Sequence, residues 1–307
     1  NNVLPTVNDP NLKVEKVFEG LRFPTKMAFL GPNDILVLEK DNGTVQRIVN
    51  GKMLPEPILD VNVANKYERG MLGIAVAKPS TGTTTTTTIA NNNNNNNNPS
   101  PTTYVFVSFT ETKVEGSDIC PRPNRCEPGH DPIGNRLYRY ELASNNSKLV
   151  NPKLLLDLPA IPGPGHNSGK IIIGPDNNLY VTIGDVGAYK TETQNYPNKP
   201  NSNGTSGVYR ITQDGKAVKA VIGDKDPLDK YYAYGLRNSF GMDFDPVTGK
   251  LWNTENGAAC CDEINLVDPG FNSGWRKVQG FWEVKGNTYG NMVQNPTDLV
   301  DFGGKGK

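Results

Sequence analysis

The feature that most constrains the fold is a repeated unit of strand, tight turn and strand. Three copies lie at residues 29–39, 173–182 and 244–255, and in each the turn is rich in Pro, Asp, Asn and Gly and the second strand ends in polar residues. Proline sets φ at about −65°, and Gly or Asn tolerates the left-handed region, so such turns suit antiparallel strand pairs. A weaker fourth copy runs over residues 71–76 and, after a long insert, 104–109.

A further apolar strand follows these pairs, at residues 44–48, 135–140 and 207–211. Sheets that recur about every 50 to 70 residues are typical of the blades of a propeller. No segment keeps an apolar period of about 3.6 residues, so helices should be few and short. We therefore predict an all-β fold, a β-propeller of four-stranded antiparallel blades. The 32 glycines and 24 prolines among 307 residues agree with a fold that needs many turns.

The chain is predicted to form a single domain over residues 1–307, because propellers of this length are common as one unit. Residues 80–103 carry a Thr tract and an Asn tract with few apolar side chains to bury, which predicts a surface loop. Basic and acidic residues number 32 each and form no basic stripe, which argues against nucleic acid or an anionic membrane as partner. No apolar run approaches the roughly 18 residues of a transmembrane segment.

Two features favour a protein that is secreted, and so extracellular, at the cell surface or periplasmic. The chain begins with Asn rather than Met, which indicates a processed or trimmed N-terminus. Sequons for N-glycosylation occur in turn-like segments at Asn42, Asn145 and Asn203.

The cysteines also indicate an oxidising compartment. Cys120 and Cys126 bracket a Pro-rich loop that a disulfide between them could close. Cys260 and Cys261 are adjacent and could bond to each other or pair elsewhere; we predict that they are oxidised to each other, because adjacent cysteines do not easily both reach distant partners. The spacing of the four cysteines, with no suitably placed His, argues against a structural zinc site.

A candidate catalytic pair lies in the third unit. His166 comes just before the first strand and Asp185 just after the second. A carboxylate beside an imidazole orients the ring and stabilises its charged form, which suits removal of a proton from a hydroxyl near neutral pH. Taken alone, the segment favours a surface histidine beside a turn; the polar ends of other strands at the same point of the repeated unit favour the catalytic pair.

The next unit is predicted to open at Ala233 and Tyr234. It adds Arg237 and Asn238 before one strand, and Glu255 with the Gly257–Ala258 backbone after another. Taken singly, the arginine fits a solvated strand-end charge and the glutamate a turn cap. Equivalent points on successive blades lie on one face of a propeller, so these residues are expected to converge with His166 around the axis. A proton acceptor beside an arginine and an oxygen-rich loop suits transfer of negative charge to an anionic, metal-assisted acceptor.

As an ordered set, these motifs resemble the soluble PQQ-dependent glucose/sorbosone dehydrogenases, especially the aldose sugar dehydrogenases of archaea and bacteria. The resemblance runs from about Gly20 to Gly280, and an ordered set is much more specific than any one short motif. The matching segments are Glu68–Ala75, His166–Gly169, Gly174–Asp176, Ile183–Asp185, Gly235–Asn238, Glu255–Gly257, Asp262–Asn265 and Gly274–Trp275.

The resemblance implies an oxidoreductase that uses PQQ and Ca²⁺ to oxidise aldose sugars at the anomeric carbon to lactones, with an external electron acceptor. His166 matches the family's general base and Asp185 the carboxylate that partners it. Arg237 and Asn238 match residues that contact the quinone, the arginine stabilising charge on its reduced form. Glu68 stands where the family has a polar residue, often Gln, that faces the sugar or the cofactor.

The resemblance also implies the calcium ligands. Gly257 and Ala258 match backbone carbonyls that hold the cofactor's calcium, although the family often has Pro at the second place. Such oxygen ligands suit calcium, which would polarise the quinone carbonyl that receives hydride. Glu263, with the backbone near Ser273, resembles a second, structural calcium site.

Two departures from the family stand out. The family has six blades, whereas this chain ends near where a fifth would begin, at about residues 301–307. It should therefore hold about four blades and be C-terminally incomplete, because an open four-blade fragment would expose sheet edges. The second departure is the vicinal pair Cys260–Cys261 in the predicted calcium loop.

Two other functions stay open. A non-catalytic extracellular binding propeller is one, since animal relatives use this fold to capture proteins, but the presence of His166, Asp185 and Arg237 together counts against it. A calcium-dependent lactonase or hydrolase is the other; such sites place carboxylate and Asn side chains on the axial metal, whereas carbonyls and an arginine dominate here. Neither the sugar nor the oligomeric state follows from the sequence.

Overall fold

The computed structural model describes residues 4–78, 102–114, 118, 131–187, 195, 203–286, 288–294, 296 and 298–302. Cys120, Cys126 and residues 80–101 of the predicted loop lie outside the described residues. Within the described residues, helical structure is limited to one 3-10 turn, Leu228–Lys230. No helix in this part of the chain has the length and apolar character that crossing a membrane requires.

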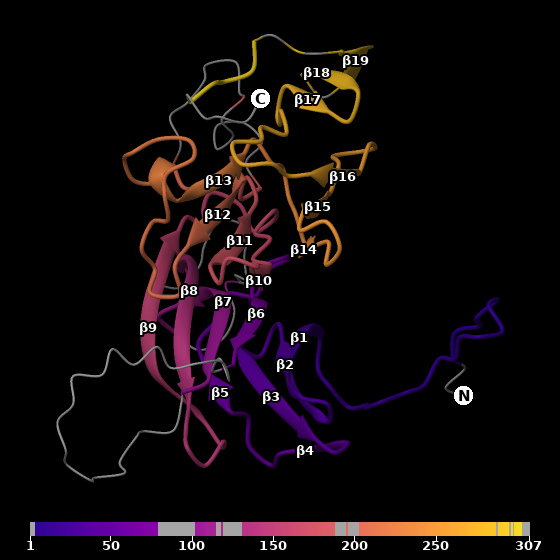
Figure 1. Cartoon of the computed structure of the whole chain (residues 1–307), viewed down its shortest axis with the longest axis vertical. Helices are drawn as coiled ribbons and strands as arrows, with labels where there is room; N and C mark the ends of the chain where they lie inside the picture. The colour runs from indigo at the N-terminus through magenta and orange to yellow at the C-terminus, as the bar shows by residue number, and fades with distance from the viewer. Residues whose placement is uncertain are drawn as a thin grey trace, which may run out of the picture.

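The strands form five antiparallel sheets that follow one another along the chain and along the long axis of Figure 1. The first sheet contains β1 (Pro24–Gly31), β2 (Asp34–Glu39), β3 (Thr44–Val49), β4 (Lys52–Met53) and β5 (Leu59–Asp60). The second contains β6 (Met71–Ala77), β7 (Tyr104–Thr112), β8 (Pro132–Leu142) and β9 (Leu149–Leu158). The third contains β10 (Ile171–Ile173), β11 (Leu179–Ile183), β12 (Gly207–Ile211) and β13 (Tyr231–Tyr234). Three strands each make the fourth sheet, β14 (Gly241–Phe244), β15 (Leu251–Glu255) and β16 (Glu263–Leu266), and the fifth, β17 (Val278–Gln279), β18 (Trp282–Lys285) and β19 (Thr288–Met292).

The repeated strand–turn–strand unit is confirmed as the basis of the fold. Its copies form the antiparallel pairs β1–β2, β10–β11 and β14–β15. In the turns, an Asp side chain bonds to the backbone two residues further on. Asp245 Oδ1 accepts the backbone N–H of Val247 at 2.9 Å, and Asp176 Oδ1 accepts that of Asn178 at 3.2 Å. These short side-chain-to-backbone bonds are the reason Asp favours such turns.

The boundaries between the sheets differ from the sequence-based prediction in two places. Residues Ala233 and Tyr234 close the third sheet instead of opening the fourth, because β13 pairs with β12 and buries its side chains there. The fourth sheet has three strands, and a further sheet already begins at Val278, well before residues 301–307. The number of blades in a complete propeller stays a prediction.

The hydrophobic core is divided among the interfaces between neighbouring sheets. One cluster joins the first and second sheets, one the second and third, and one the third and fourth. Phe106 of β7, with no exposed surface, belongs to the middle cluster, where burial of such a side chain contributes about 1.5–3 kcal/mol.

The first strands of successive sheets lie next to each other, since β6 contacts β1 and β10, and β10 contacts β14. The connections that lead into β6, β10 and β14 are therefore neighbours in space. Glu68, His166 and Arg237 each lie in one of these three connections. The sheet order thus brings together three residues that are far apart in the sequence.

Candidate active site

His166 and Asp185 form a hydrogen-bonded pair at this meeting point. Nδ1 of the imidazole bonds to Oδ1 of the buried Asp185 carboxylate. Two N–H groups also donate to this carboxylate: the backbone of Gly187 to Oδ1 at 3.1 Å and Nε1 of Trp275 to Oδ2 at 2.8 Å. An ionised carboxylate can only accept hydrogen bonds, so the Nδ1 atom bonded to it carries the ring proton. Nε2 is then left free to accept a proton.

The loop that carries His166 is held by Glu68. One carboxylate oxygen, Oε2, accepts the backbone N–H groups of His166 and Asn167, the latter at 3.2 Å. The backbone of His166 is in the left-handed region at φ 59°, as is that of Ser168 at φ 51°. Consecutive N–H groups that converge on one anion are a recurring way to hold such a turn.

Asp185 and His166 are brought together by the close approach of two backbones at Gly184. A Cβ atom on Gly184 would lie 2.3 Å from the carbonyl oxygen of His166 and 2.7 Å from that of Arg237. Only glycine leaves room for both carbonyls. The approach is completed by two bonds, from Asp185 N to Arg237 O at 2.9 Å and from Val186 N to His166 O at 3.2 Å.

Arg237 is buried at the site with only part of its hydrogen-bonding capacity used. Its Nη1 donates to the carbonyl of Asn256 at 2.8 Å, and its guanidinium lies 5.4 Å from the centre of the Trp275 ring. Its Nε has no hydrogen-bond partner among the described residues. A buried donor without a partner is costly, so this guanidinium is suited to an incoming acceptor.

Asn238 belongs to the same network. Its amide Nδ2 donates to Glu68 Oε2 at 3.1 Å, and its Oδ1 accepts the hydroxyl of Ser168 at 2.8 Å. The Ser168 hydroxyl in turn accepts the backbone N–H of Ser239 at 2.9 Å. Asn238 therefore lies beside the histidine loop.

The buried carboxylate of Glu255 bonds to the backbone of Arg237, and the partly buried carboxylate of Glu263 lies beside Glu255. Glu255 Oε1 accepts the backbone N–H of Arg237 at 2.6 Å, and Oε2 accepts the hydroxyl of Ser273 at 2.5 Å. Glu263 shares the amide of Asn265 with it, at 3.0 Å from Glu263 Oε2 and 3.2 Å from Glu255 Oε2. Burial, followed by the charge of Glu263, raises the pKa of Glu255 well above its ordinary value.

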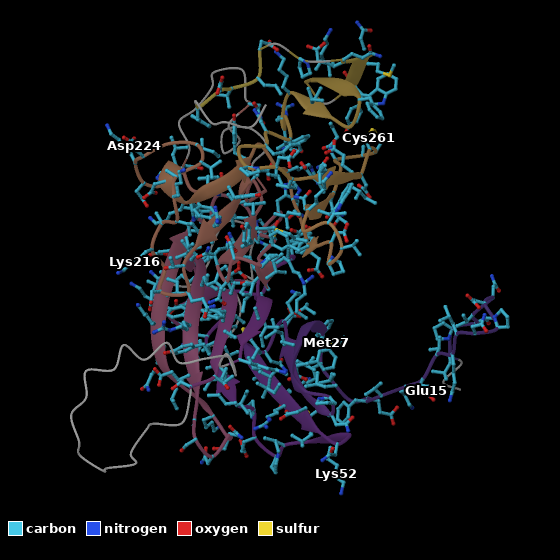
Figure 2. All side chains as sticks on the ribbon, in the orientation of Figure 1. Glu15, Met27, Lys52, Lys216, Asp224 and Cys261 are labelled. Carbon is cyan, nitrogen blue, oxygen red and sulfur yellow. A yellow bond between two sulfur atoms is a disulfide. The ribbon has the colours of Figure 1, made fainter. Side chains whose placement is uncertain are left out.

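The loop that follows β15 carries the predicted calcium carbonyls. A Cβ on Gly257 would lie 1.8 Å from the carbonyl oxygen of Cys260, so the turn requires glycine. Asp262 Oδ1 accepts the Gly257 N–H at 2.7 Å. Residues 257–262 line an open cavity of about 480 Å³, and the Sγ atoms of Cys260 and Cys261 are bonded to each other. Figure 2 shows Cys261 at the edge of the molecule opposite Lys216 and Asp224.

Among the described residues, no three His, Cys, Asp or Glu side chains are grouped to hold a metal ion. No hydrogen bond of the described residues ends on the carbonyls of Gly257 or Ala258, so these oxygens keep their capacity for a cation.

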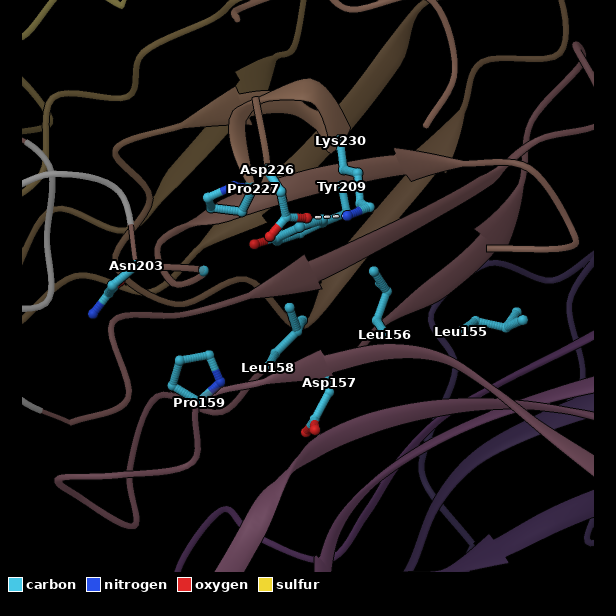
Figure 3. Close-up of a pocket in the computed structure, with 11 residues that line it drawn as sticks. Leu155, Leu156, Asp157, Leu158, Pro159, Asn203, Tyr209, Asp226, Pro227 and Lys230 are labelled. Atoms are coloured by element: carbon cyan, nitrogen blue, oxygen red, sulfur yellow. Dashed lines mark hydrogen bonds and ion pairs between the residues drawn. The ribbon is translucent and has the colours of Figure 1, made fainter. Parts of the chain in front are cut away.

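A separate cavity of about 380 Å³ lies between β9 and the segment from Asn203 to Lys230 (Figure 3). Tyr209 lines it, and an ion pair between Asp226 and Lys230 closes one side. None of the predicted catalytic, cofactor or calcium residues lines this cavity.

Residues 21–300 match the glucose/sorbosone dehydrogenase family. The chain belongs to this family. It is 35% identical to quinoprotein glucose dehydrogenase B of Acinetobacter calcoaceticus over 167 residues, which are 50% of this chain and 34% of that protein. The match thus spans about a third of the length of this curated relative.

Solved structures of the glucose/sorbosone dehydrogenase type share the fold. A putative glucose dehydrogenase of Thermus thermophilus aligns with TM-score 0.64 and 27% identity, over 88% of this chain and 69% of its own. The PQQ-bound aldose sugar dehydrogenase of Streptomyces coelicolor aligns with TM-score 0.62 and 25% identity, over 94% of this chain and 71% of its own. The predicted family and the predicted fold class are thereby confirmed.

The sequence analysis gave no role to Trp275, although it noted the Gly274–Trp275 motif. The structure places this side chain against both Asp185 and Arg237. Position alone could not reveal this, because Trp275 lies between β16 and β17, outside the repeated strand pairs. Its rarity was the available signal, since the chain has only three tryptophans.

Proposed function

We propose that the protein oxidises aldose sugars at the anomeric carbon to lactones, with PQQ and Ca²⁺ as cofactors. The observation that carries the proposal is the bond between the partly exposed His166 ring and the buried Asp185 carboxylate, with the Arg237 guanidinium held in the adjacent connection. Membership in the glucose/sorbosone dehydrogenase family supports the same class of reaction.

The residues of the site suit the quinone. PQQ carries three carboxylates and two carbonyls, and Arg237 offers a buried cation whose Nε lacks a partner in the described part of the chain. The amide of Asn238 is the neighbouring polar group. Glu68 was predicted to contact the cofactor or the sugar; because its oxygens accept N–H groups of His166, Asn167 and Asn238, we propose that it acts through them.

We propose that calcium binds the carbonyl oxygens of Gly257 and Ala258. These hard oxygen donors suit the ion, and the tight turn at Gly257 is compatible with a fixed cradle. A second calcium at Glu263 is supported by its neighbour Glu255: the partly buried carboxylate of Glu263 and the buried one of Glu255 share one hydrogen-bond network and repel each other, and a cation would relieve that repulsion.

In the proposed reaction, Nε2 of His166 takes the proton of the anomeric hydroxyl. Asp185 holds the ring through Nδ1 and stabilises the imidazolium that forms. Bound PQQ supplies the hydride acceptor, and bound calcium the Lewis acid that polarises it. The Arg237 guanidinium stabilises negative charge that develops beside it. The C–H bond at the anomeric carbon would break as hydride leaves it, and an external electron acceptor would be needed before the next turnover.

We further propose that the protein acts outside the cytosol. The sequon residues Asn42, Asn145 and Asn203 are all exposed, as glycan attachment would require. The bonded pair Cys260–Cys261 agrees with an oxidising compartment.

The test is to add PQQ and Ca²⁺ to the purified protein and to measure the quinone absorption band together with reduction of a dye by aldoses. Sugar-dependent dye reduction that requires both additions supports the proposal. Omission of calcium and omission of PQQ are the controls. Lactone hydrolysis without PQQ would favour the hydrolase instead, and binding of a quinone without any turnover would reject sugar oxidation.

A further inference from the structure

We propose that Trp275 is a positioning residue that orients the partner carboxylate of the general base and the cofactor-facing arginine at the same time. The proposal rests on the proposed function for the meaning of the two groups that it orients. The geometry itself does not depend on that function.

The indole ring of Trp275 contacts both groups. Its Nε1 donates to Asp185 Oδ2 at 2.8 Å, on the oxygen that is not bonded to His166. Its ring centre lies 5.4 Å from the guanidinium carbon of Arg237, within the usual range of a cation–π contact. One rigid ring therefore sets the distance between a buried anion and a buried cation.

The backbone of Trp275 is held as firmly as its side chain. Its N–H donates to the carbonyl of Gly235 at 2.9 Å, two residues before Arg237. Its carbonyl accepts the amide of Asn195 at 3.0 Å. The side chain is 2% exposed, whereas those of Trp252 and Trp282 are 40% and 41% exposed. Trp275 thus differs from the other two tryptophans in both burial and contacts.

The two contacts of Trp275, one through its N–H and one through its ring face, have different consequences. The indole N–H fixes the rotation of the Asp185 carboxylate, and hence the plane of the imidazole that it holds. The ring face stabilises the guanidinium of Arg237 by its quadrupole. Trp275→Phe removes the N–H and keeps a ring, whereas Trp275→Leu removes both.

Steady-state kinetics and PQQ binding distinguish these effects. We expect Trp275→Phe to lower kcat between about 10- and 100-fold, as loss of a hydrogen bond to a charged group implies, with PQQ affinity changed less than about 3-fold. Trp275→Leu should lower kcat at least as much and also weaken PQQ binding, by about 5-fold or more. Trp252→Phe is the matched control and should change neither quantity. Equal losses of kcat and PQQ affinity in Trp275→Phe, or an unchanged kcat, would overturn the proposal.

A measurement on the protein without cofactor separates this proposal from the proposed function. The three tryptophans give three indole N–H signals in a nitrogen-15 spectrum. The signal that disappears in Trp275→Phe should exchange slowest with solvent and should move in Asp185→Asn, while the other two stay in place. If that signal exchanges fast or ignores Asp185→Asn, the proposal is wrong, whether or not the protein oxidises sugars. If it behaves as expected but no PQQ-dependent turnover exists, the proposed function fails and the positioning role stands.

Discussion

At the scale of single residues, His166 combines an uncommon backbone with a fixed side chain. Its φ of 59° lies in the left-handed region, which costs a non-glycine residue about 1–2 kcal/mol. The bonds from its backbone N–H to Glu68 and from its ring to Asp185 offset that cost. The backbone and the ring of His166 are therefore each held by a carboxylate.

The first prediction follows from the role of the ring. His166→Gln removes the proton acceptor, so turnover at saturating aldose should fall by about 10²–10⁴-fold, while the PQQ dissociation constant changes much less. Dye reduction and PQQ titration measure the two quantities. A variant that keeps near wild-type turnover would show that another group takes the proton.

At the scale of elements, the end of β11 decides whether the catalytic pair can form. Gly184 follows this strand directly and lies against the carbonyls of His166 and Arg237. Asp185 follows it and bonds through its backbone to Arg237. Two connections from different sheets thus meet on one residue that has no side chain.

The second prediction tests this contact. Gly184→Ala should destabilise the fold by about 1–3 kcal/mol, because the new methyl group must displace two backbone carbonyls. Turnover should fall further than the loss of folded protein explains, since the displaced carbonyl belongs to His166. Urea unfolding and kinetics on the folded fraction provide the measurements. Gly31→Ala is the control: like Gly184 it lacks a positive φ, and the nearest atom to its added Cβ, the Cβ of Asp34, lies 3.7 Å away.

The third prediction concerns the loop after β15. Cys260 and Cys261 should be oxidised to each other in gently purified protein, so the peptide that contains both should weigh two hydrogens less than its dithiol form. Replacement of both by Ser should loosen the loop around Gly257 and Ala258 and weaken calcium-dependent binding of PQQ. Two free thiols in the native protein would refute the pairing.

At the scale of the whole molecule, the candidate site belongs to no single sheet. Glu68 precedes the second sheet, His166 the third and Arg237 the fourth, while Trp275 lies ahead of the fifth. The three core clusters between the sheets set how these connections meet. A ligand bound among them should therefore stabilise the folded chain as a unit.

The fourth prediction uses this linkage. PQQ at 100 times its dissociation constant, with Ca²⁺, should add about 2.7 kcal/mol to the free energy of unfolding and raise Tm by several degrees. A calcium chelator should abolish the rise, and His166→Gln should retain it, because the histidine moves a proton but is not proposed to hold the cofactor. Scanning calorimetry with and without chelator gives the comparison. An unchanged Tm with PQQ and calcium would argue against binding at this site.

The sequence by itself determined the strand pairs and the positions of the polar groups at their ends. Local physics was sufficient there: Asp, Asn, Gly and Pro specify the turns at Asp176 and Asp245 through bonds to their own neighbours. The ordered motifs also identified the family and placed His166 beside Asp185.

Only the tertiary structure decided which distant groups touch. Glu68 holds the backbone of His166 and the amide of Asn238 across 98 and 170 positions of sequence, and its contact with the cofactor or sugar stays a prediction. Trp275 reaches Asp185 across 90 positions. No local pattern encodes such contacts, because they depend on how the sheets pack and on which connections that packing makes neighbours. The boundary at β13 was missed for the same reason, since its assignment to the third sheet depends on pairing with β12.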